Sequence, residues 1–125
     1  MTPLSALQEA MYETLTGLGY TVFDYRPMEE PFPYMVIGED DLSSSHLKNK
    51  PHYTVISTVN VFSKYEGNKE VKEMLDAFIS NCDRHMSLTG WKISHMEVLN
   101  TDLLLDTQPD VIHGIAIVEY QICKI

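Results

Sequence analysis

The sequence predicts an α+β domain, a two-layer sandwich in which two helices pack on a mainly antiparallel sheet of four to five strands, in the order α-β-β-β-α-β-β. The clearest observation is a change of hydrophobic period within a few residues. Residues 53–62 alternate with a period of two and are rich in β-branched and aromatic side chains, as in a strand. Residues 71–82 instead place apolar side chains at helical spacing, as in a helix that faces a core. At 125 residues, the chain fits a single domain, 1–125, with one core.

The N-terminal segment predicts the first helix, from Pro3 to Leu18. Thr2 is suited to the N-cap and Pro3 to the first helical position. Gly19 is suited to the C-cap. The apolar residues in between share one helical face: Leu4, Leu7, Met11, Leu15 and Leu18.

Two short strands are expected next, at Tyr20–Tyr25 and Tyr34–Gly38. The connection between them, residues 26–33, contains three prolines and is expected to be extended without regular structure. The continuous apolar run at Tyr34–Gly38 is typical of a strand covered on both faces.

The longest polar stretch, Glu39–Pro51, predicts a mobile loop at about 39–51. It contains three acidic residues, three serines and two lysines, which do not build a core. Loops of this length are often mobile or functional. The strand at 53–62 and a helix ending at about Asp83 follow it.

The C-terminal third predicts two more strands, and both helices are expected to cover the same face of the sheet. Residues Trp91–Leu99 alternate as a strand, and His113–Ile122 form the last strand. Asp106–Asp110 is a turn. The pattern at 100–112 is ambiguous, because Leu103–Leu105 either extends the strand at Trp91–Leu99 after a kink or lies outside it.

Charge and cysteine content exclude several classes of protein. Nine basic and eighteen acidic residues give a net charge of −9, which disfavours binding of nucleic acid phosphates. The two cysteines, Cys82 and Cys123, are expected to be buried reduced thiols, and they are too few for an ordinary zinc site. No window approaches the ~20 apolar residues of a membrane span, and the N-terminus does not resemble a signal peptide. Synthesis in the cytosol, without membrane contact, is therefore expected.

No residue pattern points to catalysis. Of the five histidines, His95 and His113 come together only if the last two strands pair, and a metal site would need Asp102 or Asp106 as a third ligand. A small metal-dependent hydrolase built on that pair is the catalytic hypothesis. The acidic pairs and runs near residues 29 and 40 lie in polar loops and are expected to be solvated. We expect no catalytic residue, cofactor or metal, and hence no enzyme.

Three segments of the chain are distinctive when taken together. In order, they are the N-terminal helix with Val22–Tyr25 and a proline-rich lead into Pro33–Gly38, then Val59–Ser63 followed after Gly67 by Lys69–Val71, and finally Asp110–Ala116. In this order and at these distances they resemble the tail completion or tail-to-head joining proteins (tail terminator-like) of long-tailed bacteriophages. The resemblance covers nearly the whole chain.

The resemblance implies a structural virion protein that caps the head-proximal end of the phage tail tube and joins the tail to the head connector. It implies a ring, hexameric in the assembled virion, through which DNA passes without specific binding. The implied partners are other copies of the chain, the tail tube protein and the head connector or stopper protein. The implied location is the head–tail interface of the virion, after synthesis in the cytoplasm of the bacterial host. The acidic balance fits this role, because a channel for DNA must not retain it.

Within that reading, the polar stretch is the expected contact region. Leu42 and Leu47 are apolar residues in polar surroundings, which often anchor interfaces. The predicted partner-binding residues are Asp40, Asp41, Leu42, His46, Leu47 and Lys48. The alternative function is a small cytosolic α+β adaptor or ligand-binding module, which a concave apolar pocket would favour.

Overall fold

The computed structural model describes residues 2–45 and 52–125 and confirms the predicted α+β class and element order. The elements are α1 (Pro3–Gly17), β1 (Val22–Phe23), β2 (Tyr34–Ser45), β3 (His52–Ser63), α2 (Lys69–Asn81), β4 (Trp91–Leu105) and β5 (Ile112–Lys124).

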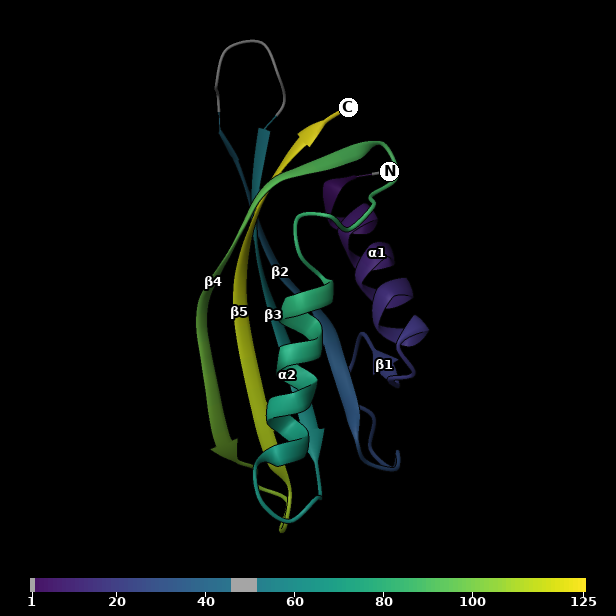
Figure 1. Ribbon diagram of the computed structural model, residues 1–125, viewed down its shortest axis with the longest axis vertical. Coiled ribbons are helices and arrows are strands. Elements are labelled where there is room, and N and C mark those ends of the chain that lie inside the picture. The colour runs from purple at the N-terminus through teal and green to yellow at the C-terminus, as the bar shows by residue number, and fades with distance from the viewer. Residues whose placement is uncertain (1, 46–51) are drawn as a thin grey trace.

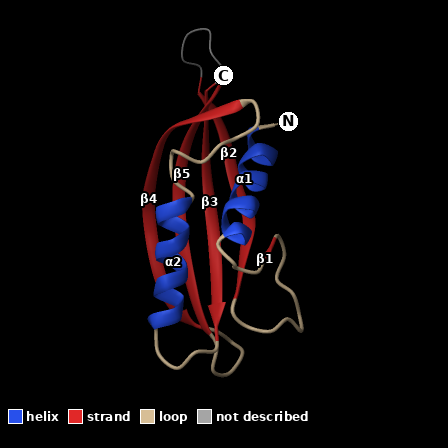
Figure 2. Ribbon diagram, turned by 45° about the vertical axis from the view of Figure 1, so that its right-hand side comes forward, coloured by secondary structure: helices blue, strands red, loops and turns tan. Residues whose placement is uncertain are grey.

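The strands form one five-stranded sheet in the order β1-β2-β3-β5-β4. The short β1 pairs with β2 in parallel, and the three remaining pairings are antiparallel. Both helices lie on the same face of the sheet, with α1 on β1 and β2 and α2 on β3 and β5 (Figures 1 and 2). We call this the helix face, and the opposite one the open face.

Each helix forms where the sequence predicts it. The Thr2 hydroxyl accepts a hydrogen bond from the Ser5 N–H at 3.2 Å and so caps α1, whose buried residues include Leu7, Met11 and Leu15. In α2 the buried positions repeat at helical spacing and meet the sheet: Val71, Met74, Leu75 and Phe78. None of the helices in the described ranges is long and apolar enough to cross a membrane.

The helix α2 packs closely on β5 because Gly114 leaves room for it. A Cβ added at Gly114 would lie 2.5 Å from Val71 Cγ1 and 2.7 Å from Val61 Cγ2. At the other end of α2, the buried Tyr120 hydroxyl donates a hydrogen bond to the Cys82 carbonyl oxygen. Both contacts fix α2 on the centre of the sheet.

The prediction of a loop at 39–51 is wrong in its first half, because β2 continues to Ser45. Gly38, at φ +102°, lies in a break of register between Val36 and Glu39, after which pairing with β3 resumes as far as Ser45 opposite His52. This part of β2 lies at the sheet edge, where polar side chains are tolerated. The mobility predicted for the remainder, 46–51, concerns residues outside the described ranges.

One smaller expectation is corrected, and one ambiguity is resolved. The strand β1 has only two residues, within the predicted Tyr20–Tyr25. The ambiguous segment after Leu99 extends β4 to Leu105, with a bulge between Val98 and Asn100 that supplies the kink.

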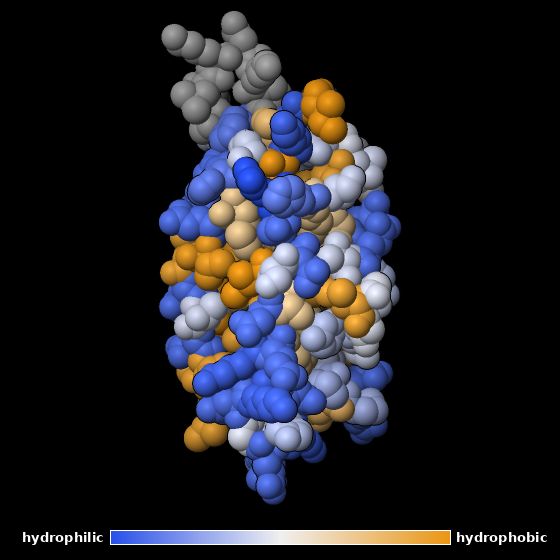
Figure 3. Space-filling view, viewed as in Figure 1, coloured by the Kyte–Doolittle hydropathy of each residue, from blue (hydrophilic) through white to orange (hydrophobic). Residues whose placement is uncertain are grey.

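The surface of the molecule carries apolar side chains along its β4 side, at the left in the view of Figure 1 (Figure 3).

Candidate functional site

The described part of the predicted contact region, Asp40 to Leu42, is divided between the two faces of the sheet. By register, Asp40 and Leu42 lie opposite Ser57 and Val55, which are buried on the helix face. Asp41 therefore points to the open face. The other predicted contact residues, His46, Leu47 and Lys48, lie outside the described residues.

Asp40 is partly buried and Leu42 is partly exposed. The Ser57 hydroxyl donates a hydrogen bond to Asp40 Oδ1 at 2.7 Å. Burial raises the pKa of Asp40 above its ordinary value, while the Ser57 hydrogen bond opposes that change. Leu42 is 38% exposed, so it remains available to a partner.

The open face is acidic, and its acids come from three strands. Register places Asp41 of β2, Glu119 of β5 and Glu97 of β4 in one row across the sheet, with Ile56 of β3 between the first two. Glu97 and Glu119 are direct cross-strand partners, an arrangement that like charges make unfavourable. The row therefore concentrates negative charge on the open face, where Glu119 also accepts a hydrogen bond from the Gln121 side-chain amide.

Neighbouring rows on the open face also contain acidic residues. Glu39 lies in the next row with Thr58, Ile117 and Asn100, and Asp102 lies in the row of Asn60 and Ile115. The face thus combines five carboxylates with half-buried threonine and isoleucine side chains. The open-face acids are Glu39, Asp41, Glu97, Asp102 and Glu119.

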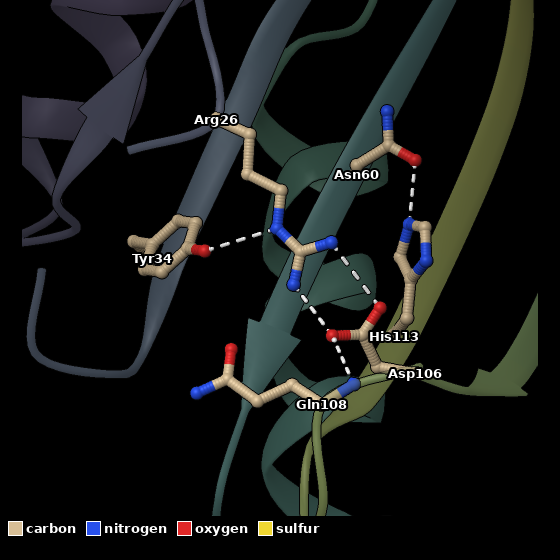
Figure 4. A network of polar contacts seen from close by, with 6 residues as sticks. All are labelled: Arg26, Tyr34, Asn60, Asp106, Gln108 and His113. Carbon is tan, nitrogen blue, oxygen red and sulfur yellow. Dashed lines mark hydrogen bonds and ion pairs between the residues drawn. The ribbon is translucent and has the colours of Figure 1, made fainter. Parts of the chain in front are cut away.

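A polar network closes one end of the open face and includes its arginine (Figure 4). Arg26 lies in the connection before β2, and its guanidinium donates two hydrogen bonds to Asp106 in the β4–β5 turn, at 3.2 Å and 2.5 Å. It also donates to the Tyr34 hydroxyl at 3.4 Å and lies 4.3 Å from the centre of the Phe62 ring. The network joins segments eighty residues apart.

His113 completes this network. Its ring stacks on Phe62, with 4.4 Å between ring centres, and its Nε2 lies 2.6 Å from Asn60 Oδ1. Burial lowers the pKa of His113, and the hydrogen bond from Arg26 lowers the pKa of Asp106. His113 is therefore a neutral packing residue at pH 7, and Asp106 is ionised.

The hypothesis of a metal site at His95 and His113 is wrong in its geometry. β4 and β5 do pair, as that hypothesis required, but His95 lies opposite Gln121 and His113 opposite Leu104. The two histidines are thus separated by eight residues along β5, roughly 26 Å at the rise of a strand. Asp106, a suggested third ligand, is occupied by Arg26.

The residues in 2–45 and 52–125 contain no group of three His, Cys, Asp or Glu side chains that could hold a metal ion. Both cysteines are free. Burial raises the pKa of Cys82 to about 12, so this side chain is an unreactive thiol.

Comparison with known proteins shows a likeness of fold to solved structures. No family model and no curated protein matches the sequence. Among solved structures, a chain of the virion of a native gene transfer agent particle superposes with a TM-score of 0.77, covering 97% of this chain and 94% of that chain at 13% sequence identity. The two chains share one fold. At this identity the match establishes the architecture over nearly the full length of both chains.

Sequence reasoning missed the row of acids and the Arg26–Asp106 pair. Neither has a local signature, because the row joins three strands and the pair joins two connections. One signal was available. Arg26 is the only basic residue before Lys48, and an isolated arginine among many acids suggests a specific carboxylate partner.

Proposed function

We propose that this chain is a structural virion protein that caps the head-proximal end of a phage-like tail tube and joins it to the head connector, as a ring with DNA passing through. The observation that carries the proposal is the fold shared, from end to end, with a chain of a gene transfer agent virion. The segment order that resembles tail completion proteins supports the finer assignment.

The acidic open face supports the same role. Five carboxylates on a helix-free sheet surface repel the phosphates of a passing duplex, and its one arginine is held by Asp106. The helices, with their mixed charge, then face outward. We propose that the open face lines the channel and that the protein performs no catalysis.

The proposed partners are other copies of this chain, the tail tube protein and a head connector or stopper protein. Contact with them places the protein at the head–tail interface of the virion. DNA passes without sequence-specific contact.

The test is complementation of a phage or particle system from which the gene for this chain has been deleted. Electron microscopy of the lysate should show DNA-filled heads and finished tails that are not joined, or tails of abnormal length, and expression of the chain in trans should restore whole particles. Whole, infectious particles formed without the protein would refute the proposal.

A further inference from the structure

The sheet has two long free edges. β1 pairs with Met35 and Val36 only, so the outer edge of β2 from Gly38 to Ser45 has no partner strand among the described residues. At the opposite end of the sheet, the outer edge of β4 from Lys92 to Leu105 likewise has no partner strand among the described residues. Free edges expose backbone donors and acceptors that can accept another strand.

The β2 edge is accompanied by an apolar groove. A groove of about 600 Å³ lies between α1 and β1, with Leu4, Tyr12, Phe23 and Ile37 in its lining. Ile37 directly precedes the free part of β2, so a strand added there would run beside the groove. An edge with an adjacent side-chain pocket is the usual arrangement for recognition by strand addition.

The β4 edge is apolar and lacks a helix above it. The helices pack over β1, β2, β3 and β5, and β4 stands apart at the side of the molecule (Figure 1). Its exposed apolar side chains gather on the surface at that side (Figure 3). They are Val98 at 38% exposure, Leu99 at 44%, Leu104 at 42% and Leu105 at 90%. The register places Val98 and Leu105 on the helix face, Leu104 on the open face and Leu99 in the bulge between Val98 and Asn100.

Both edges are acidic. Residues 1–45 contain eight carboxylates and a single basic side chain, Arg26, which pairs with Asp106. The elements α2 and β4 together contain three lysines and five carboxylates. Contact between the two edges therefore depends on backbone pairing and burial of apolar side chains rather than on charge.

The strand order makes the two edges compatible. β2 and β4 run in opposite directions, because three antiparallel pairings separate them. A second copy rotated about an axis along the strands would place its β2 antiparallel to β4 of the first copy. This contact joins two different surfaces of the chain, so it is head-to-tail. Repeated contacts of this kind form a closed ring when the rotations between successive copies add up to a full turn. A two-fold contact between β2 edges would instead bring Glu39, Asp40 and Asp41 against their own copies.

We infer that copies of this chain associate by edge-to-edge pairing, with β4 of one copy added antiparallel to the free edge of β2 in the next and its helix-face side chains Val98 and Leu105 against the α1–β1 groove. The inference rests on the proposed ring and specifies the surface that forms it. Pairing covers the exposed leucines of β4, removes both free edges and gives a continuous sheet whose open face lines the channel.

Cysteine cross-linking tests this contact. Ser43, Thr54, Gln121 and His95 occupy one row across the sheet, all on the open face. Ser43→Cys is therefore combined with His95→Cys, and separately with Glu97→Cys to allow for stagger between copies, in a Cys123→Ser background. Directly opposed side chains on paired strands have Cβ separations close to those of a disulfide. Mild oxidation is applied to the concentrated protein and to assembled particles.

A double variant should give a ladder of cross-linked dimers, trimers and larger species on a non-reducing gel, and each single-cysteine variant should remain monomeric. Adding Leu99→Asp should reduce cross-linking at least several-fold. Leu18→Asp, at 48% exposure and outside both edges, is the matched control and should not reduce it.

Other results overturn the inference. Dimers from a single-cysteine variant would show a two-fold contact, and a lack of cross-links in both samples would show that the edges do not pair. The proposed function fails separately. If the double variants restore particles but do not cross-link, the joining role stands and this contact is wrong. If the ladder forms but deletion leaves particles whole, the contact stands and the joining role is wrong.

Discussion

The two faces of the sheet are built by the same strands and differ in almost every property. On the helix face, the side chains of β3 and β5 are fully buried, as Val55, Val59, Val118 and Ile122 show. The buried polar groups there, Ser57 and Ser63, donate hydrogen bonds to Asp40 and Glu70. On the open face, the intervening residues at 54–60 and 113–121 are half-exposed, and β2 and β4 add exposed carboxylates. A small second core is buried at one end of this face, formed by Tyr34, Val36, Phe62 and Val111.

This contrast separates stability from function. Burial of the helix face supplies the free energy of folding, since buried apolar area contributes roughly 25 cal/mol per Å². The open face contributes less and even places Glu97 opposite Glu119, an arrangement that fits the proposed lining of a DNA channel. Alternation along each strand makes both possible, because neighbouring residues point to opposite faces.

The largest expected effect lies on the helix face. Phe78→Ala should lower the free energy of unfolding by about 3–5 kcal/mol, because Phe78 is fully buried between α2 and the sheet. Ile117→Ala, on the open face, should cost about 1 kcal/mol. Urea unfolding followed by circular dichroism measures both. Equal losses in the free energy of unfolding would mean that side chains on the open face are buried as completely as those on the helix face.

Close packing of α2 on the sheet predicts the next effect. Gly114→Ala should cost about 1–3 kcal/mol, because the new Cβ would overlap Val71 and Val61. Gly17→Ala is the matched control. It lies at the end of α1 with no heavy atom within 4 Å of the added Cβ, and it should stabilise the protein by about 0.4–1 kcal/mol. A neutral Gly114→Ala would show that α2 is not held against β5.

The Arg26–Asp106 pair predicts an acid-dependent loss of stability of about 1 kcal/mol or less, since Arg26 is 41% exposed. The pKa of Asp106 is lower in the folded protein than its ordinary value of about 3.9. The pair therefore makes its full contribution to the free energy of unfolding at pH values above that ordinary value. Its contribution disappears as the pH falls through the folded-state pKa. Asp106→Asn should therefore reduce stability at pH 6 and match the wild type near pH 2.

Urea titrations at several pH values measure this difference. Asp110→Asn, an exposed change in the same turn, is the control and should follow the wild-type curve. An Asp106→Asn protein that keeps the full acid dependence would show that the pair does not hold the turn.

The smallest effect on stability, below about 0.5 kcal/mol, is expected for charge reversal on the open face. The triple variant Asp41→Lys, Glu97→Lys and Glu119→Lys should bind duplex DNA about tenfold or more tighter than the wild type at low salt. Glu13→Lys, Glu73→Lys and Asp76→Lys change the net charge equally on the exposed side of the helices and form the control. Fluorescence anisotropy of a labelled duplex compares them. Equal binding by both variants would mean that only net charge matters.

The sequence predicts the helix face well and the open face poorly, for a physical reason. Burial imposes periodicity, so the stripes around Leu7 and Phe78 and the alternation of β3 are visible in the sequence. Edge strands need no apolar pattern, so residues 39–45 resembled a loop although they pair with β3. His95 and His113 are kept apart by the hairpin register of β4 and β5, which pairs Leu104 with His113 near the turn and His95 with Gln121 far from it.

The predicted contact residues show the same limit. Asp40, Asp41 and Leu42 lie on a free edge, in keeping with a contact role, but strand alternation divides them between the faces. The acidic row of Asp41, Glu119 and Glu97 depends on two pairings between distant segments. Such a site becomes visible only once the strand order is known.

The most direct test of the account is a reconstruction by electron cryomicroscopy of the head–tail junction in particles that contain this chain. The account predicts a ring of copies at the head-proximal end of the tail tube, with Asp41, Glu97 and Glu119 facing the DNA channel and α1 and α2 on the outside. A ring whose helices line the channel, or a position of the chain away from the junction, would contradict it.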